Sequence, residues 1–539
     1  MVNKQKEKEM IKILITDKLA KEGIELLKTM KDVEPVVKTG ISPEELISII
    51  GEYDGLIVRS ETKVTAKVLE KSGKLRGIAR AGAGVDNIDV PAATKKGILV
   101  MNTPGGNTLS AAEHTMALML AMSRHIAPAS TKFKGGEWDK KSFMGNQLNN
   151  KVLGIIGLGR IGMAVAKMST GFNMKILGYD PVAVPPDAEK LGVEITDNLE
   201  RIFKEADIIT VHVPKNEQTL NMIGEAQLKM MKPTTKLINC ARGGIINEDA
   251  LYDALENKTI AAAALDVFTE EPPVKNKRYE KIANLLVTPH LGASTAEAQV
   301  EVAVEAAQIL ADYLKTGAIK NAVNAPATGG AMPPVVNTYA TLAQRIGMLV
   351  SAMSGGQIKK IELQYRGSIA EHSVGLITSS FQIGLLQSSS EDPVNMVNAS
   401  SLAKERGISI DVTKNPEAKN VASGFGAKVT TAKGTCTFTG TVFNDKIMRI
   451  IEINGFDVEM TPADNAMIIF NDDKPGVIGA VGTVLGKHGI NIQTMGVGQK
   501  AAEKKAVLAF SLDAMPDEKT VKDISGLGFV NEVHLCKLS

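Results

Sequence analysis

The N-terminal part of the chain alternates short runs of apolar, mostly β-branched residues with stretches of helical periodicity. Strands are predicted at residues 12–16, 34–38, 55–59, 75–80 and 97–101. Because strands that alternate with helices pair in parallel through right-handed crossovers, this pattern predicts a parallel α/β sheet. The polar turn NTPGGNTLS follows, and its Ser110 is the expected cap of the next helix.

A longer series of the same kind runs from Lys151 to His290. Its predicted strands are residues 151–156, 175–180, 207–213, 236–240, 261–267 and 284–290. Six strands with intervening helices match a doubly wound, nucleotide-binding sheet. A helical pattern from Ser294 to Leu314 follows, and we expect it to lead back to the first domain, which would make that domain discontinuous.

Two linkers divide the rest of the chain. Residues 324–336, rich in Pro, Gly and Ala, predict an interdomain linker, and residues 461–465, TPADN, predict a second one. Residues 337–460 mix helices and strands around no catalytic motif that we identify. The C-terminal segment predicts strand–helix–strand–strand–helix–strand, a ferredoxin-like pattern. At roughly 150 residues per domain, 539 residues suggest three to four domains.

Composition and charge exclude several classes of function. The chain carries 62 Lys and Arg against 60 Asp and Glu, so its net charge of +2 predicts no nucleic-acid partner. No apolar run approaches the ~18 residues of a membrane-spanning helix. The cysteines, Cys240, Cys436 and Cys536, lie too far apart for a disulfide framework or a metal motif. We therefore expect a soluble, cytoplasmic protein without a metal site or a membrane partner.

The clearest local motif is GLGRIG, in which Gly157, Gly159 and Gly162 form G-x-G-x-x-G. One glycine makes the tight turn, one lets the backbone approach a pyrophosphate, and one lets helix and strand pack closely. The N–H groups at the start of the following helix then point at the phosphates. The motif follows an apolar strand and opens an amphipathic helix, which is the context that a dinucleotide site requires.

Asp180 ends the next strand, 23 residues after Gly157 and 18 after Gly162. A carboxylate at this place accepts a hydrogen bond from the ribose 2′-OH and repels a 2′-phosphate. Residues 181–183 supply no Arg for that phosphate, so NAD is favoured over NADP. The simpler alternative is that Asp180 is a turn residue before Pro181.

Three residues with charged or proton-transferring side chains follow predicted strands of the second sheet, where ligands of doubly wound folds bind. They are Arg242, Glu271 and His290. Each has a plain alternative, namely a surface ion pair, a solvated loop charge and a packing histidine. Together they suit the interconversion of an alcohol and a ketone, because His can take the hydroxyl proton, Glu can orient the imidazole, and Arg can bind a carboxylate. Asp266 ends another strand and could hold a nicotinamide.

The motifs GLGRIG, NCARGG, ALDVFTEEPP and TPHLGAST, in this order, resemble those of the D-isomer-specific 2-hydroxyacid dehydrogenase family. VRSETKVT, ARAGAGVDNID and NTPGGNTLSAAEH are similar to the members that act on a phosphorylated substrate, and the C-terminal half fits their long form. The resemblance implies an α/β fold in which a Rossmann NAD-binding domain (107–290) is inserted into a flavodoxin-like substrate domain (10–106 and 291–325). An α+β intervening domain (330–460) and a ferredoxin-like ACT domain (465–539) would follow.

The resemblance also implies an activity, the NAD-dependent oxidation of D-3-phosphoglycerate to 3-phosphohydroxypyruvate, the first step of L-serine biosynthesis. His290 would be the general base, Glu271 would orient it, and Arg242 would bind the substrate carboxylate or carbonyl. The implied NAD contacts are Gly157, Gly159, Arg160, Ile161, Gly162, Asp180, Val213, Pro214, Cys240, Ala241, Arg242, Asp266, His290, Gly292 and Ala293.

A phosphorylated substrate needs cationic side chains, and Arg59 and Arg80 end two strands of the first domain. Their plain alternative is surface charge. The expected substrate-binding set is Arg59, Ser60, Arg80, Ala81, Gly82, Asn107, Ser110, Lys140 and Lys141. The two lysines stand where the family often has an Arg and would act across a dimer interface, although Lys cannot form the planar fork of Arg.

The C-terminal segment resembles an ACT domain, in which Asn471, Asp473 and Asn491 match positions that bind a regulatory amino acid such as L-serine. Serine-sensitive members are expected to have a His at position 471, so the alternative is a dimerisation surface without a ligand. The family resemblance implies a homodimer or homotetramer.

Two other functions remain open from the sequence. One is a glyoxylate or hydroxypyruvate reductase, or another D-2-hydroxyacid dehydrogenase, against which the paired Arg59 and Arg80 and the extra domains argue. The other is a non-catalytic NAD-sensing scaffold, against which the complete set of Arg242, Glu271 and His290 argues.

Overall fold

The computed structural model describes residues 10–182, 184–326, 332–391, 393–417 and 421–538, so residues 327–331 of the first predicted linker lie outside it. Within these residues the strands form four sheets, and the predicted α/β class is confirmed. Short 3-10 helices connect several elements: η1 (Ile50–Glu52), η2 (Glu189–Leu191), η3 (Arg278–Lys281), η4 (Ser368–Glu371), η5 (Gln387–Ser389) and η6 (Ala501–Glu503). None of the described helices has the length and apolar character needed to cross a membrane.

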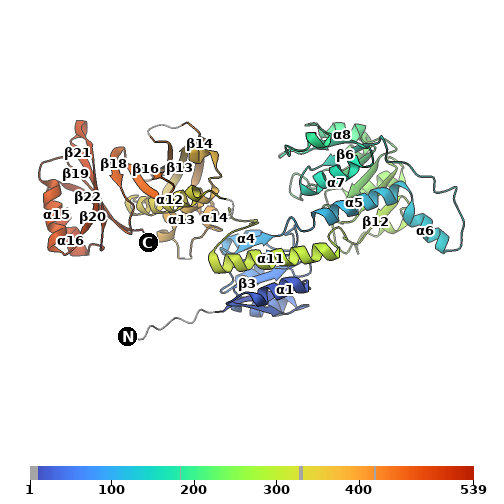
Figure 1. Ribbon diagram of the computed structural model, residues 1–539, viewed down its shortest axis with the longest axis horizontal. Coiled ribbons are helices and arrows are strands. Elements are labelled where there is room, and N and C mark those ends of the chain that lie inside the picture. Colours follow the sequence, from blue (N-terminus) through green and yellow to red (C-terminus); the bar gives the residue numbers. More distant parts are fainter. Residues whose placement is uncertain (1–9, 183, 327–331, 392, 418–420, 539) are drawn as a thin grey trace.

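The first sheet has five parallel strands in the order β2-β1-β3-β4-β5, the flavodoxin-like arrangement. They are β1 (Ile11–Ile15), β2 (Val33–Val37), β3 (Gly55–Val58), β4 (Gly77–Arg80) and β5 (Leu99–Asn102). One face is covered by α1 (Lys21–Thr29) and α11 (Ala296–Thr316), the other by α2 (Pro43–Ile49), α3 (Ala66–Glu70) and α4 (Val90–Lys95). The chain returns from the second sheet through α11, as Figure 1 shows. Gly55 leaves room for Leu314 of α11, which a Cβ would approach to 2.7 Å.

The second sheet has seven parallel strands in the order β12-β11-β10-β9-β6-β7-β8, which is the Rossmann order with one strand added. They are β6 (Val152–Ile156), β7 (Lys175–Tyr179), β8 (Val193–Ile195), β9 (Ile208–Val211), β10 (Lys236–Asn239), β11 (Ala262–Leu265) and β12 (Leu285–Val287). The prediction of six strands was wrong because it missed β8, whose three residues alternate too briefly to show a period. Helices α5 (Thr108–Ser123) and α7 (Arg160–Thr170) cover one face, and α8 (Leu199–Glu205), α9 (Glu225–Met230) and α10 (Glu248–Glu256) the other.

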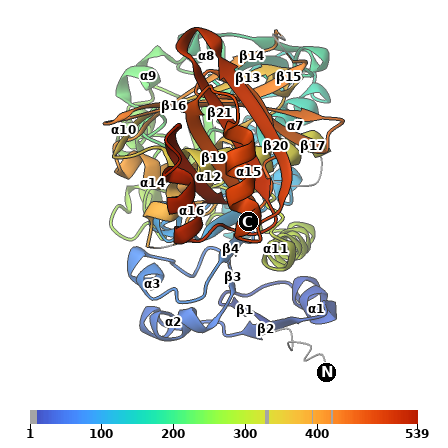
Figure 2. The ribbon, with the colours of Figure 1, turned by 90° about the vertical axis from the view of Figure 1, so that its left-hand side faces the viewer.

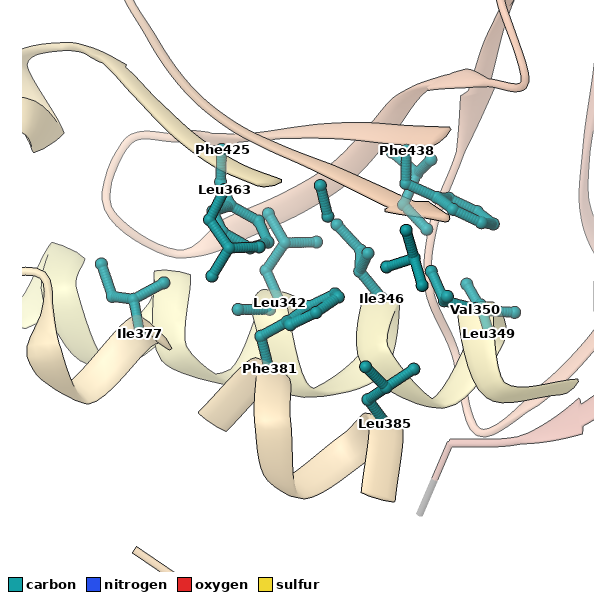
Figure 3. Close-up of a cluster of buried hydrophobic side chains, with 14 of the residues drawn as sticks. Leu342, Ile346, Leu349, Val350, Leu363, Ile377, Phe381, Leu385, Phe425 and Phe438 are labelled. Carbon is teal, nitrogen blue, oxygen red and sulfur yellow. The ribbon is translucent and has the colours of Figure 1, made fainter. Parts of the chain in front are cut away.

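The third sheet packs on two long helices. Its order is β14-β13-β15-β16-β17-β18, antiparallel except for the pair β13–β14. The elements are α12 (Pro334–Met353), β13 (Ile358–Gly367), α13 (Gly375–Leu386), α14 (Ala399–Glu405), β14 (Ser409–Asn415), β15 (Ser423–Thr431), β16 (Gly434–Phe443), β17 (Ile447–Ile453) and β18 (Phe456–Met460). Figure 3 shows Leu342 and Ile346 of α12 with Phe381 of α13, below Phe425 and Phe438 of the strands. These buried side chains form the core of this domain.

The C-terminal sheet has the order β20-β21-β19-β22 with all pairs antiparallel, so the predicted ferredoxin-like pattern is confirmed. Its elements are β19 (Asn465–Asp472), α15 (Val477–Lys487), β20 (Ile492–Lys500), β21 (Lys505–Leu512), α16 (Glu518–Ser525) and β22 (Val530–Lys537). Both helices lie on one face, turned outward in Figure 2. The other face, through Ile468 and Val507, joins the core of the third sheet.

Candidate active site

A cavity of about 610 Å³ lies between the first and second sheets. Arg59 and Arg80, at the carboxyl ends of β3 and β4, line it from one side together with Ser60, Ala81 and Gly82. Glu271, His290 and Ala293 line it from loops of the second sheet, beside the apolar rings of Phe268 and Tyr279. The structure therefore brings together in one cleft residues that the sequence placed on separate strand ends.

Glu271 and His290 form a hydrogen-bonded pair, with 2.7 Å between Oε2 of the carboxylate and Nδ1 of the imidazole. The second carboxylate oxygen, Oε1, accepts from the backbone N–H of Phe268 at 3.1 Å, which fixes its orientation. Burial alone would raise the pKa of Glu271, but the hydrogen bond and the charge of His290 hold it below its ordinary value. An ionised carboxylate only accepts, so Nδ1 carries the proton and Nε2 is left as the basic nitrogen.

Arg242 follows β10 in a loop that Asn239 holds together. The buried Asn239 amide donates to the carbonyl of Arg242 at 2.9 Å and its oxygen accepts from the N–H of Ala241 at 3.0 Å. Nε of Arg242 donates to Asp86 at 3.0 Å, across the cleft to the turn after β4. The side chain of Arg242 thus connects the two sides of the cleft, although it does not line the 610 Å³ cavity itself.

The two arginines of the first sheet carry buried donors without a partner. Nε of Arg59 and Nε of Arg80 are both inaccessible and make no hydrogen bond with the described residues. Burial, followed by the positive charges of Arg242 and Arg59, lowers the pKa of Arg80 to about 10. The guanidinium groups of Arg59, Arg80 and Arg242 lie close together and have unused donors, so this part of the cleft favours the binding of an anion.

A network in the turn after β3 holds Arg59 in place. The carboxylate of Asp17 accepts from the backbone N–H groups of Arg59 at 2.5 Å and of Thr62 at 3.0 Å. The amide of Asn87 donates to the carbonyl oxygens of both residues. Gly82 has a φ of 139°, and a Cβ at that position would overlap the guanidinium of Arg80. Sequence reasoning gave no role to these three residues: Asp17 stands in no motif, and Thr62 and Asn87 lie within VRSETKVT and ARAGAGVDNID without a sign of the contacts that they make.

The glycine loop has the close approaches that its motif requires. Gly157 adopts a φ of 99°, and a Cβ there would come within 2.7 Å of the backbone of His212. A Cβ on Gly162 would overlap the carbonyl oxygen of Gly157, whereas one on Gly159 would meet no atom within 4 Å. Gly159 therefore faces open space at the start of α7, where a phosphate group would approach the backbone.

Asp180 joins the end of β7 to the glycine loop. Its Oδ2 accepts from the N–H of Leu158 at 2.9 Å and its Oδ1 from the N–H of Val182 at 2.9 Å. Arg160 and Ile161 begin α7 beside it. These carboxyl ends of β6 and β7 are adjacent in the sheet, so the structure brings the glycine loop and Asp180 together.

The remaining predicted cofactor residues follow β9 and β10. Val213 is buried beside Pro214, and Cys240 is buried before Ala241. Burial raises the pKa of the Cys240 thiol to about 12, so this residue is a neutral, apolar wall at neutral pH. Burial also lowers the pKa of His212 to about 4, which leaves the imidazole below the glycine loop uncharged. The described residues contain no cluster of His, Cys, Asp and Glu that could hold a metal ion.

Asp266 is fully buried at the end of β11 and is engaged by protein donors. Its Oδ1 accepts from Thr288 Oγ1 at 2.6 Å and from Leu291 N at 2.7 Å, and lies 3.1 Å from His114 Nε2. Its Oδ2 accepts from Gly292 N at 2.9 Å. A carboxylate offers about four acceptor positions, so only Oδ2 keeps capacity for a further donor.

Four predicted substrate residues lie away from the cavity lining. Asn107 precedes α5 and its Oδ1 is buried without a hydrogen bond to the described residues. Ser110 lies inside α5 and does not cap it, because the helix begins at Thr108; its hydroxyl instead bonds Thr295 Oγ1 at 2.7 Å. Lys140 and Lys141 are exposed on the segment after α6 (Ile126–Lys134), which projects from the second domain in Figure 1. They do not line the cavity of their own chain.

The structure separates the three predicted effector residues: Asn471 and Asp473 lie at the Lys505 end of the C-terminal sheet, whereas Asn491 precedes β20 at the opposite end. Asn471 is buried in β19, and its Oδ1 makes no hydrogen bond with the described residues, while its amide donates to Asp472 O at 2.8 Å. Asp473 accepts from Gln499 Nε2 at 3.1 Å, and the N–H of Asn491 donates to Asp513 at 2.8 Å. An unpaired acceptor therefore faces the turn before α15.

Sequence reasoning also missed Gln299, Thr288 and His114. Gln299 lines the cavity from α11 and its amide donates to Ala293 O at 2.8 Å, which holds the loop after His290. His114 lies in the AEH sequence of α5, where its chain position gives no hint of Asp266.

Comparison with known proteins matches three segments of the chain to domain families. Residues 116–292 match the model of the D-isomer specific 2-hydroxyacid dehydrogenase, NAD binding domain. Residues 335–454 match the D-3-phosphoglycerate dehydrogenase intervening domain, and residues 466–529 match the ACT domain.

Curated relatives match over nearly the whole chain. A D-3-phosphoglycerate dehydrogenase of Synechocystis is 40% identical over 98% of this chain and 95% of its own length. One of Methanocaldococcus jannaschii is 41% identical over 98% of this chain and 100% of its own length. Among solved structures, D-lactate dehydrogenase from Aquifex aeolicus complexed with NAD and lactic acid superposes with a TM-score of 0.53 at 28% identity, covering 58% of this chain and 100% of that one. The chain therefore belongs to the D-3-phosphoglycerate dehydrogenases, long-chain members of the D-isomer-specific 2-hydroxyacid dehydrogenase family.

Proposed function

We propose that this chain catalyses the NAD-dependent oxidation of D-3-phosphoglycerate to 3-phosphohydroxypyruvate, the first step of L-serine biosynthesis. The observation that carries the proposal is that Arg59 and Arg80, each with a buried Nε that has no partner among the described residues, line the same cavity as the Glu271–His290 pair. A phosphate group in the cavity would accept charge-assisted hydrogen bonds from these guanidinium groups while the hydroxyl lies near the imidazole. An unphosphorylated hydroxyacid would leave them unpaired.

The residues around the glycine loop fit NAD. Gly159 leaves open space at the start of α7, and Asp180 ends the neighbouring strand, where it suits a ribose and disfavours a 2′-phosphate. Asp266 is fully buried, so we assign it to holding the backbone of residues 291–292 beside the place of a nicotinamide rather than to direct contact with it. Bound NAD supplies the acceptor for the hydride that leaves C2 of the substrate.

The chain's own residues supply binding and proton transfer. His290 takes the hydroxyl proton on Nε2, because Nδ1 already donates to Glu271. Glu271 stabilises the imidazolium that forms, as its ionised carboxylate lies 2.7 Å away. Arg242 binds the substrate carboxylate, in the place where Asp86 now meets its guanidinium.

Turnover of two substrates that differ only in the phosphate group tests this function. We expect NAD reduction with D-3-phosphoglycerate to exceed that with D-glycerate by about 100-fold or more in kcat/KM, since several charge-assisted hydrogen bonds are lost. Equal turnover of both would favour the alternative of a general D-2-hydroxyacid dehydrogenase. NAD binding without turnover of either would favour a scaffold.

We also propose that L-serine, or a similar amino acid, binds near Asn471 and Asp473, at the end of the sheet away from Asn491. The support is the buried Asn471 Oδ1, whose lack of a described partner leaves an acceptor for an ammonium group. Calorimetric titration of the wild type and of the Asn471→Leu variant with L-serine measures whether binding depends on this side chain. Binding that is equal in both proteins would move the effector elsewhere.

A homodimer or homotetramer would complete the site. The segment that carries Lys140 and Lys141 also exposes Phe133, Trp138 and Met144, with exposed fractions of 60%, 80% and 86%. Large apolar side chains on a projecting segment are typical of a surface that a second copy covers. Sedimentation of the wild type and of Trp138→Ser measures this, and a wild-type monomer would contradict it.

A further inference from the structure

The turn that carries His290 is held by one buried residue. Three successive backbone N–H groups donate to Asp266: His290 N to its carbonyl oxygen at 2.8 Å, Leu291 N to Oδ1 at 2.7 Å and Gly292 N to Oδ2 at 2.9 Å. Asp266 itself is fully buried at the end of β11. The position of the imidazole therefore depends on how this carboxylate is oriented.

The backbone of the turn needs that support. His290 has a φ of 56°, in the left-handed region that residues with a Cβ rarely adopt. Such a conformation is strained and persists only where surrounding contacts impose it. Without the three hydrogen bonds to Asp266, the turn would relax, and the imidazole would leave the direction set by Glu271.

His114 contacts Asp266 from the opposite side. It lies on α5, and its Nε2 is 3.1 Å from Asp266 Oδ1 and 3.2 Å from Thr288 Oγ1. The Thr288 hydroxyl donates to the same Oδ1 at 2.6 Å, so its oxygen is free to accept. A proton on His114 Nε2 is then shared between the two oxygens, and this is the only arrangement in which each close contact joins a donor to an acceptor.

We propose that His114 is a positioning residue, which fixes the Asp266 carboxylate through Nε2–H and thereby holds the 290–292 turn in the conformation that aims His290 into the cleft. Helix α5 also carries Ser110, whose hydroxyl bonds Thr295 at the start of α11. It therefore contacts both the 290–292 turn and the helix through which the chain returns to the first domain. The charged groups that face His290 are Glu271 from the second domain and Arg59 and Arg80 across the cavity.

The charge state of Asp266 agrees with this role. Burial alone would raise the pKa of Asp266, but hydrogen bonds from His114, Thr288 and the turn amides hold it below its ordinary value. Each donor removed leaves a buried carboxylate less satisfied, which favours rotation of the group or uptake of a proton. Either change breaks a hydrogen bond to the turn.

The test compares His114→Leu with His114→Gln, whose amide nitrogen can occupy the place of Nε2 and donate. For His114→Leu we expect kcat to fall about 10- to 100-fold, because small displacements of a catalytic group cost this much, while Kd for NAD changes much less. The acid limb of the kcat/KM profile should move to lower pH, because the displaced His290 loses its hydrogen bond to Glu271. His114→Gln should restore most of both properties.

Two further measurements separate positioning from stability. Thr115→Val removes a hydroxyl from the next residue of α5, which bonds Ala111 O within the helix, and should change Tm without moving the pH profile. In the protein without NAD, the pH midpoint of His290 modification by diethyl pyrocarbonate, mapped by mass spectrometry, should shift in His114→Leu only.

The proposal is overturned if His114→Leu keeps kcat and the pH profile of the wild type, or if His114→Gln is as impaired as His114→Leu. If His114→Leu does not fold, His114→Asn takes its place, because its shorter side chain carries an amide that cannot reach Asp266. The test rests on the proposed oxidation; a protein that binds NAD and turns over no substrate would refute that function, while the chemical modification would still test the positioning.

Discussion

The Glu271–His290 pair allows a sharp prediction. Glu271→Gln keeps the shape of the side chain and removes the negative charge that lies 2.7 Å from Nδ1. A hydrogen bond to a charged partner contributes about 1.5–3 kcal/mol. The two side chains are 46% and 38% exposed, so solvent screening places the loss in the lower half of that range. At about 1.4 kcal/mol per decade, kcat for oxidation should fall about 10- to 30-fold.

The same change should alter the pH dependence with a defined sign. The carboxylate of Glu271, whose pKa is lowered, is ionised at neutral pH and stabilises the protonated imidazole. Removing it withdraws a negative charge beside Nδ1, so the acid limb of kcat/KM should move to lower pH. Steady-state NADH formation across pH, with NAD and D-3-phosphoglycerate varied, measures both effects.

A matched control is the neighbouring Glu270→Gln. Glu270 pairs with Lys275 at 2.8 Å on the surface and does not contact His290, so this variant should keep the kcat and the pH profile of the wild type. The reasoning is refuted if Glu271→Gln changes kcat by less than about threefold and leaves the acid limb in place, since the pair would then contribute little to the transition state.

Three other predictions follow from particular contacts. Arg80→Met removes one buried cation of the cavity, so kcat/KM for the phosphorylated substrate should fall about 10- to 150-fold while that for hydroxypyruvate changes little; equal losses for both substrates would contradict a phosphate contact. Gly162→Ala places a Cβ on a carbonyl oxygen and should lower Tm, whereas Gly159→Ala should keep Tm and weaken NAD binding in calorimetry; the reverse order would contradict the roles of the two glycines. Lys236 is buried, pairs with no described carboxylate, and has a pKa lowered from 10.5 by burial. Between the lowered pKa and 10.5 the unfolded chain binds the Lys236 proton more strongly than the folded protein does, so the free energy of unfolding of the wild type should rise with pH. Denaturant titrations should show that Lys236→Met removes this rise. At neutral pH this variant should be about 1 kcal/mol more stable than the wild type.

Much of the fold could be predicted because alternating apolar runs and helical stretches identify parallel sheets. The glycine motif and the strand order that follows from it placed the dinucleotide site at β6 and β7. The strand β8 was missed because three residues give too short a period. The six-stranded sheet of the third domain was not resolved into its strands, since its pairing between distant segments leaves no local signature.

The sequence points to candidate site residues where a motif marks a strand end. Arg242, Glu271 and His290 follow β10, β11 and β12, and the carboxyl ends of neighbouring parallel strands meet at one edge. Asp17 and Asn87 were not predictable, because they act on Arg59 and Thr62 through backbone groups from distant turns.

The capping role of Ser110 was wrong for a local reason. Its hydroxyl bonds Thr295, 185 residues away, and the helix starts two residues earlier at Thr108. A side chain that serves a long-range contact cannot be distinguished from a helix cap by its place in the chain.

The central claim is that the cavity selects a phosphorylated substrate. Oxidation of NADH by 3-phosphohydroxypyruvate, hydroxypyruvate and glyoxylate, each at varied concentration with the purified protein, tests it most directly. We expect kcat/KM for 3-phosphohydroxypyruvate to exceed that for both smaller ketoacids by about 100-fold or more, because only its phosphate pairs with the guanidinium groups of Arg59 and Arg80 that line the cavity. Equal or faster turnover of hydroxypyruvate or glyoxylate would contradict it.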